Sequence, residues 1–264
     1  MTADGRARES GRVEGRVAIV TGAGRGIGRA AALTLAKRGA HVLGVSRTQA
    51  ELDSLAAEAP VQILAEDVST EDGCRHVVDE ARSRLGPIEI LVNNAGIGSA
   101  HETVVWEADP EVWHETLRVN LDGPFHLTRL AAPDMVARRW GRIVMVSSTA
   151  GQIGAPRMPA YCASKHGLIG LMRATAQDVG PHDVTCNAVL PGWVRTEMAE
   201  RSARFEAERR GITEDEVWAE RASEYPPGRV ISPEEIAEVI AFLASEGASG
   251  ISGEAVTVAL GGPW

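Results

Sequence analysis

Three side chains suited to proton transfer beside a reactive carbonyl stand close together in the chain: Ser148, Tyr161 and Lys165. Tyr161 and Lys165 are four residues apart in the run YCASK, so on a helix they share one face. A phenol has a pKa of about 10 and is a poor acid–base catalyst at neutral pH unless a nearby positive charge stabilises the phenolate. Lys165 can supply that charge. The spacing alone fits an ordinary amphipathic helix equally well, so the elements around it must decide.

A glycine-rich turn near the start of the chain predicts a site for the phosphates of a dinucleotide. Residues 17–21 form an apolar, β-branched run typical of a buried strand, and residues 30–38 are strong helix formers. Glycines between them allow a tight turn and a close backbone approach to a pyrophosphate, while the helix start supplies free N–H groups. The expected contact residues are Gly22, Gly24, Arg25, Gly26, Ile27 and Gly28.

Short apolar segments alternate with helix-length segments along the chain. This alternation predicts an α/β fold, a Rossmann-type doubly wound and mainly parallel seven-stranded sheet with helices on both faces. The strands are expected at residues 16–21, 41–45, 61–65, 88–92, 141–147, 184–190 and 255–258.

Polar and small residues follow several of these strands, and ligands bind such sheets beyond the carboxyl ends of the strands. Asp67 could accept a hydrogen bond from an adenine amine, and the Thr196 hydroxyl could meet a nicotinamide carboxamide. The run at 93–96 fits a simple tight turn equally well, because Asn and Gly favour turns. The other candidates for cofactor contact are Ser46, Arg47, Val68, Asn94, Ala95, Gly96, Pro191, Gly192 and Val194.

Composition narrows the class of protein. The 264 residues are 44% apolar, and a net charge of -9 without a basic block argues against a nucleic-acid partner. The cysteines at 74, 162 and 186 lack paired metal-ligand spacing and are interpreted as free thiols in a reducing compartment. No apolar run approaches the length of a membrane span. We therefore expect a cytoplasmic protein without a membrane partner or a bound metal, with a flexible tail over residues 1–12 and one domain over residues 13–264.

Seven motifs stand in order along nearly the whole chain: TGAGRGIG at 21–28, Asp67, NNAG at 93–96, Asn120 in VNLDG, Ser148, YCASK at 161–165 and PGWVRT at 191–196. In this order and spacing they resemble the short-chain dehydrogenase/reductase family. The resemblance implies a single Rossmann-type domain and a nicotinamide cofactor. It also implies a catalytic tetrad of Asn120, Ser148, Tyr161 and Lys165.

The resemblance, combined with the chemistry of these side chains, gives each tetrad member a role. Tyr161 would protonate the carbonyl oxygen as hydride leaves the nicotinamide ring, and Ser148 would hold that oxygen by a hydrogen bond. Lys165 would lower the pKa of the phenol and bind the nicotinamide ribose. Asn120 would interrupt regular helical bonding and hold a water that touches Lys165. Without the resemblance, Asn120 is interpreted more simply as a solvent-facing polar residue of a helix.

Cofactor choice depends on the end of the second strand, where a carboxylate would bind the NAD ribose and exclude the 2′-phosphate of NADP. Ser46 and Arg47 occupy that place, and no carboxylate occurs before Glu51. Arg47, together with Arg25, could therefore clamp a phosphate. We expect a preference for NADP(H), with NAD(H) as the alternative.

Residues 197–227 form a long insertion with charges between apolar positions, which predicts two short helices. Because it follows the expected nicotinamide-binding turn directly, it suits a substrate lid, although a plain surface excursion has the same pattern. Trp193 and Met198 near its start would give an apolar lining. Such a lining favours a medium-sized or acyl-type ketone over a small polyol.

Two subfamilies compete for the substrate. The overall spacing resembles 3-oxoacyl-carrier-protein reductases and polyketide ketoreductases, and Arg139 and His182 fall at positions that would face a carrier protein. The insertion resembles 3-hydroxybutyrate dehydrogenases, but the positions of their substrate ligands hold Ala150 and Met158, with Gln152 and Arg157 close by.

A β-ketoacyl or polyketide-type ketoreductase therefore ranks first, with a substrate that a carrier protein could present. An NAD(H)-dependent dehydrogenase of a small hydroxy acid or alcohol ranks second. A non-catalytic, cofactor-sensing protein ranks last, because such a role would not need the tetrad. The resemblance also implies a homotetramer.

Overall fold

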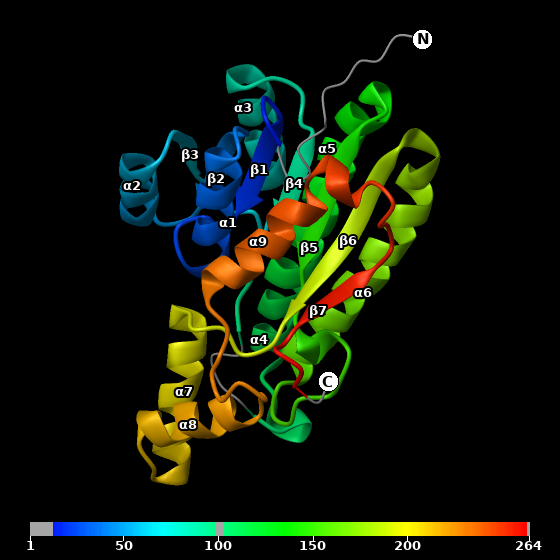
Figure 1. Ribbon diagram of the computed structural model, residues 1–264. Coiled ribbons are helices and arrows are strands. Elements are labelled where there is room, and N and C mark those ends of the chain that lie inside the picture. Colours follow the sequence, from blue (N-terminus) through cyan, green and yellow to red (C-terminus); the bar gives the residue numbers. More distant parts are fainter. Residues whose placement is uncertain (1–12, 99–102, 263–264) are drawn as a thin grey trace.

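The computed structural model describes residues 13–98 and 103–262, and the predicted tail over residues 1–12 lies outside them. Seven strands form the centre of the molecule (Figure 1). They are β1 (Val17–Thr21), β2 (His41–Ser46), β3 (Val61–Ala65), β4 (Ile90–Asn93), β5 (Gly141–Val146), β6 (Val184–Pro191) and β7 (Ala255–Val258). The α-helices are α1 (Gly26–Lys37), α2 (Gln49–Glu58), α3 (Glu71–Arg84), α4 (Pro110–Leu117), α5 (Gly123–Arg138), α6 (Pro159–Val179), α7 (Glu197–Arg210), α8 (Glu214–Ser223) and α9 (Pro233–Leu243).

The strands make one sheet in the order β3-β2-β1-β4-β5-β6-β7, and every neighbouring pair is parallel. The predicted doubly wound α/β fold is thus confirmed, with a sheet that is wholly parallel rather than mainly so. The strand order reverses between β1 and β4. Ligands of such sheets bind in the crevice beyond the carboxyl ends of the strands at this reversal, which is where the predicted site residues lie.

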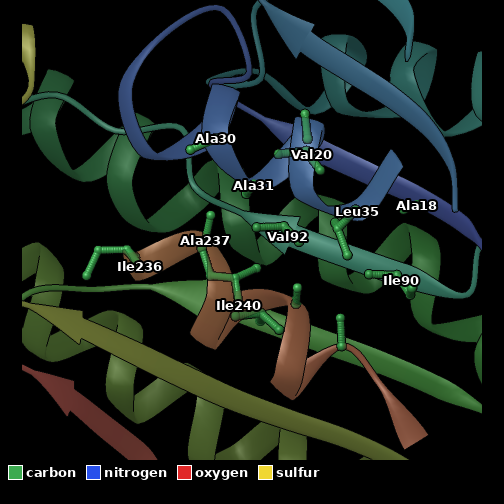
Figure 2. Packing of buried hydrophobic residues seen from close by; sticks show 14 of the residues in the cluster. Ala18, Val20, Ala30, Ala31, Leu35, Ile90, Val92, Ile236, Ala237 and Ile240 are labelled. Carbon is green, nitrogen blue, oxygen red and sulfur yellow. The ribbon is translucent and has the colours of Figure 1, made fainter. Parts of the chain in front are cut away.

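Helices cover both faces of the sheet because its strands are apolar on both sides. On one face α1 and α9 pack together over β1 and β4, and Figure 2 shows Ala31 and Leu35 of α1 meeting Ala237 and Ile240 of α9. The other face is covered by α3, α5 and α6, whose buried side chains form a second cluster with β1, β4, β5 and β6. Packing from both faces holds the strand ends rigidly in place.

Strand boundaries differ by one or two residues from those predicted. The fourth strand begins at Ile90 rather than Ile88, because the Ile88 N–H donates to the Asp134 carboxylate (3.0 Å) instead of a neighbouring strand. The first strand begins at Val17, whose N–H donates to the Glu89 carboxylate (3.1 Å). Side chains distant in the sequence thus take over the hydrogen bonds that would have extended each strand.

The insertion after β6 forms the two helices that its pattern predicts, α7 and α8. Arg221 is 3% exposed and stacks over Trp193, with its guanidinium carbon 3.7 Å from the ring centroid. The same guanidinium donates to the Ala199 carbonyl (3.0 Å) and to Glu206 (3.1 Å) of α7. The two helices and the residues after β6 therefore form one packed unit. Within the described parts of the chain, no helix is both long and apolar enough to cross a bilayer.

Candidate active site

The ends of β1 and β4 are joined by side-chain hydrogen bonds. Thr21 Oγ1 accepts the N–H groups of Asn94 (3.1 Å) and Ala95 (3.0 Å), and Asn94 Nδ2 donates to the Thr21 carbonyl (2.8 Å). These contacts fix the NNAG segment beside the glycine turn. The asparagine therefore braces two strands in addition to any contact with a ligand.

The glycine turn forms a cradle that side chains would fill. Gly22 has φ of 65°, in the left-handed region that favours glycine, and a Cβ there would lie 3.0 Å from Ala95 Cα. A Cβ at Gly28 would overlap the Gly22 carbonyl oxygen. Arg25 precedes α1 without capping it by its side chain, so the first N–H groups of the helix face the turn. These features fit the pyrophosphate of a dinucleotide.

One pocket brings together most of the predicted contact residues from six segments of the chain. It begins at the glycine turn, passes the end of β2 and reaches Tyr161 and Lys165. The predicted residues that line it are Gly22, Gly24, Arg25, Gly26, Ile27, Ser46, Arg47, Asp67, Val68, Asn94, Ala95, Gly96, Tyr161, Lys165 and Thr196.

Four predicted cofactor contacts lie behind the pocket wall. Gly28 packs beneath the turn, and Pro191 pairs with Val258 at the edge of the sheet. The Gly192 N–H donates to the Val258 carbonyl (3.0 Å), and Val194 is 5% exposed and pairs with Ile231. These residues shape the backbone that carries Thr196.

Tyr161 and Lys165 share one turn of α6, as their spacing predicts. Lys165 Nζ is 5.6 Å from the Tyr161 ring centroid and donates to the Val146 carbonyl (2.9 Å) at the end of β5. Burial raises the pKa of Tyr161, and a hydrogen bond with Ser148 opposes that shift. Burial lowers the pKa of Lys165 to about 8. A phenol, a hydroxyl and a weakly solvated ammonium thus meet where β5 and α6 approach each other.

Asn120 lies in a π-helical turn, Arg118–Asp122, between α4 and α5. Its side chain is fully buried, accepts the Ile97 N–H (2.8 Å) and donates to the Ile97 carbonyl (2.9 Å). It also donates to Ser164 Oγ (3.1 Å) within YCASK. A Cβ at Gly96 would lie 3.2 Å from Asn120 Oδ1 and 3.5 Å from Lys165 Nζ. The irregular turn expected at Asn120 is present, and it places the residue next to the lysine.

Comparison with known proteins identifies the family. The family model described as enoyl-(acyl carrier protein) reductase, a model of short-chain dehydrogenases/reductases, matches residues 22–262. The chain belongs to the short-chain dehydrogenase/reductase family. The prediction made from its motifs is therefore confirmed, and the protein is an oxidoreductase that acts on CH–OH groups.

Relatives within the family differ in substrate. The D-beta-hydroxybutyrate dehydrogenase of Cupriavidus necator is 34% identical, with 91% of this chain and 95% of that protein covered. A 3-oxoacyl-[acyl-carrier-protein] reductase of Escherichia coli is 36% identical, with 93% and 96% covered. A structure of a tryptophan variant of actinorhodin polyketide ketoreductase with NADPH superimposes with a TM-score of 0.89 at 32% identity, covering 93% of this chain and 96% of that one.

Several pocket residues of this short-chain dehydrogenase/reductase were missed from the sequence. Glu51 and Glu197 line the pocket and contact Arg25, although they are 26 and 172 residues away from it. Ser147, the residue after β5, donates its hydroxyl to the Lys165 carbonyl (3.0 Å) and also lines the pocket. No local pattern marks the two glutamates, since only the fold brings them to the glycine turn. Ser147 and Ser148 are adjacent in the sequence, but a role is predicted only for Ser148.

The lowered pKa of Lys165 predicts how ketone reduction depends on pH. In the role predicted from the sequence, Lys165 stabilises the Tyr161 phenolate only while it is cationic, and it loses its proton as the pH rises through about 8. Tyr161 keeps its transferable proton there because burial raises its pKa. We expect kcat/KM for reduction to be level below about pH 7 and to fall above about pH 8. A pH profile at constant ionic strength tests this, and a level profile to about pH 10 would contradict it.

Proposed function

We propose that the protein is an NADP(H)-dependent ketoreductase that interconverts a ketone and a secondary alcohol, most favourably a β-ketoacyl or polyketide-type ketone. The observation that carries the proposal is that Tyr161 and Lys165 line the pocket that begins at the glycine turn, while Ser148, outside the pocket lining, hydrogen-bonds with Tyr161. The relatives named as a 3-oxoacyl-carrier-protein reductase and a polyketide ketoreductase support this substrate class.

The catalytic roles follow from the chemistry of the side chains. When bound, the nicotinamide ring supplies the hydride. Tyr161 gives its phenolic proton to the carbonyl oxygen, and Ser148 holds that oxygen by a hydrogen bond. The positive charge of Lys165 stabilises the phenolate that Tyr161 becomes. Asn120 ties the π-helical turn to the YCASK helix through Ser164 and so keeps the lysine and the tyrosine in register.

The cofactor would be held by the glycine turn and by the residues after β2. Arg47 and Thr48 line the pocket, and Thr48 precedes α2 without capping it by its side chain. A phosphate on the adenosine ribose would therefore meet a guanidinium and the positive end of a helix. The structure of the actinorhodin ketoreductase with NADPH supports NADP(H) over NAD(H).

The unit formed by α7 and α8 would act as the substrate lid. Its first turn approaches the loop after the NNAG segment, since a Cβ at Gly98 would lie 3.2 Å from Met198 Cγ. Met198 is 41% exposed and lines the pocket, so it presents an apolar surface to a substrate. The other predicted apolar residue, Trp193, packs under Arg221 instead.

A carrier protein that presents the substrate would dock far from the tyrosine of the same chain. Arg139 follows α5 and pairs with Asp183 (2.6 Å), the neighbour of His182. Arg139 precedes β5 and Asp183 precedes the neighbouring strand β6, whereas Ser148 follows β5, and a strand of six residues spans about 20 Å. A carrier at Arg139 and His182 would need a flexible arm of about that length. The homotetramer and the cytoplasmic location stay predictions.

Oxidation of a small hydroxy acid by NAD(H) is the second candidate. The relative named D-beta-hydroxybutyrate dehydrogenase favours it, as does the two-helix insertion. The chemistry near the tyrosine disfavours it, because Ala150 and Met158 offer no charge to a carboxylate. Gln152 accepts a hydrogen bond from Thr257 (3.4 Å).

A panel of substrates with both cofactors tests the proposal. β-Ketoacyl thioesters, cyclic and aromatic ketones, and small keto acids are each offered with NADPH and with NADH, and kcat/KM is measured. We expect the highest value for NADPH with a β-ketoacyl or cyclic ketone. Arg47→Ala should lower kcat/KM for NADPH by about tenfold and leave that for NADH nearly unchanged. A wild-type preference for NADH with 3-oxobutanoate would favour the second candidate.

A further inference from the structure

A carboxylate lies inside the cofactor pocket beside the end of β2. The side chain of Glu51 covers Gly24, because a Cβ added to that glycine would lie 2.9 Å from Glu51 Cβ and 3.0 Å from Ser46 Oγ. All three residues line the same pocket. The adenosine ribose of a dinucleotide binds near the end of this strand in doubly wound sheets. The charge of Glu51 therefore acts on whatever group occupies the ribose 2′ position.

Arg25, the nearest cation, is held by two carboxylates. Its Nη1 lies 3.1 Å from Glu51 Oε1 and 2.5 Å from Glu197 Oε2. Glu51 belongs to the first turn of α2 and Glu197 to the first turn of α7, so the guanidinium bridges the two helices. Both carboxylates contact the same nitrogen, so a phosphate that binds this guanidinium shares its positive charge with Glu51 and Glu197 and lies next to like charges.

Arg47 differs from Arg25 in its surroundings. It is exposed, lines the same pocket and has no ion-pair partner among residues 13–98 and 103–262. Its charge is available to a phosphate without displacing a carboxylate. A 2′-phosphate in this pocket would thus meet two arginines: Arg47, which has no ion-pair partner among the described residues, and Arg25, which is paired with Glu51.

We propose that Glu51 is a specificity-determining residue that limits the preference for NADP(H), because its carboxylate competes with the 2′-phosphate for Arg25. The inference rests on the proposed binding of a nicotinamide dinucleotide in this pocket. Arg47 is then the principal partner of the phosphate, and Glu51 can accept a hydrogen bond from the free 2′-hydroxyl of NAD(H). The chain accordingly discriminates between the two cofactors less strongly than its arginines alone would allow.

Binding of two adenosine nucleotides tests this without any turnover. Calorimetry gives the dissociation constants of 5′-AMP and of adenosine 2′,5′-bisphosphate, which differ only in the 2′-phosphate. We expect Glu51→Gln to raise the preference for the bisphosphate by about tenfold, the size of one charge-assisted hydrogen bond. Glu58→Gln is the matched control, because Glu58 lies on the same helix, pairs with Arg29 (2.8 Å) and stands outside the cofactor pocket. Its preference should stay within about twofold of wild type.

A second substitution shows whether Arg25 carries the effect. Arg25→Met should lower the bisphosphate preference more in the Glu51→Gln protein than in the wild type, because only there is the guanidinium released. High salt should shrink the gain, since half-exposed charges are screened. An unchanged preference in Glu51→Gln, or an equal gain in the double variant, would overturn the inference.

The outcome separates this inference from the proposed function. If the Glu51→Gln preference rises but no ketone is reduced, the competition for Arg25 stands and the ketoreductase proposal is wrong. If ketones are reduced with NADPH while Glu51→Gln and the Glu58→Gln control have the same bisphosphate preference, the ketoreductase proposal stands and the competition for Arg25 is wrong. Thermal melts by circular dichroism accompany every variant, and equal melting temperatures show that the nucleotide affinities refer to folded protein.

Discussion

Replacing Tyr161 with phenylalanine is expected to lower kcat/KM for ketone reduction by about 10³- to 10⁴-fold while the protein stays folded and binds its cofactor. The substitution removes one hydroxyl from a side chain that is otherwise retained on α6. Ser148 and Lys165 remain, so a carbonyl oxygen can still be held, but the phenolic hydroxyl that would give it a proton is absent. Steady-state kinetics with NADPH, together with the fluorescence change of NADPH on binding, measure both quantities.

The second tyrosine supplies the control. Tyr225 is 2% exposed, and its hydroxyl oxygen accepts the Trp193 N–H (2.6 Å) near the lid. Tyr225→Phe should therefore cost about 1–3 kcal/mol of the free energy of unfolding, since a buried N–H loses its partner. It should keep kcat within about tenfold of wild type. Near-wild-type turnover by Tyr161→Phe would exclude Tyr161 as the proton donor.

Much of the fold could be predicted because the relevant signals are local. The buried parallel strand β1 is a short apolar run, and the crossover helix α1 is a longer segment of helix formers. The errors fall where distant side chains intervene. Asp134 of α5 takes the N–H of Ile88, and no pattern near residue 88 reveals that contact. The type of an element can therefore be predicted from the sequence, whereas its exact first and last residues often cannot.

In the candidate site, too, some arrangements follow from local sequence and others only from the tertiary structure. The spacing of Tyr161 and Lys165 determines their position on one helical turn, which is a local property. The environment of Arg25 depends on Glu51 and Glu197, which only the folded chain brings together. Motifs consequently identify candidate reacting groups from local spacing, whereas cofactor selection depends on charges whose neighbours are set by tertiary structure. The same limit applies to the substrate, since the lid contacts the pocket through Met198 at the start of α7.

The buried charge of Lys165 is expected to lower the free energy of unfolding while it favours the reaction. The side chain is 4% exposed and hydrogen-bonds only to the Val146 carbonyl among the described residues. Its pKa falls from 10.5 to about 8, so keeping the charge at neutral pH costs about 3 kcal/mol of folding free energy. In the proposed mechanism this charge stabilises the neighbouring phenolate, which would offset its cost to stability through activity. Removing the charge should therefore harm the reaction and not the fold.

Lys165→Met tests this divergence, since methionine fills a similar volume without charge. We expect kcat/KM to fall by about 10²- to 10³-fold, because the Tyr161 phenolate loses the cation that stabilises it. The free energy of unfolding should stay unchanged or rise by up to about 2 kcal/mol, as relief of the buried charge outweighs the unpaired Val146 carbonyl, which costs about 1–3 kcal/mol. Urea titration and steady-state kinetics on the same preparation give both values.

The pH dependence of stability identifies the charge as the cause. Between about pH 8 and 10.5 the unfolded chain holds a proton on Lys165 that the folded chain has released, so wild-type stability should rise with pH over that window as far as this residue contributes. Below about pH 8 both states are protonated and the residue adds no slope. In Lys165→Met this contribution disappears, so the stability of the variant relative to wild type should fall by about 3 kcal/mol between about pH 8 and 10.5, which would leave wild type the more stable protein. A difference that stays constant from pH 7 to about pH 10 would show that packing, and not the buried charge, sets the effect of the substitution.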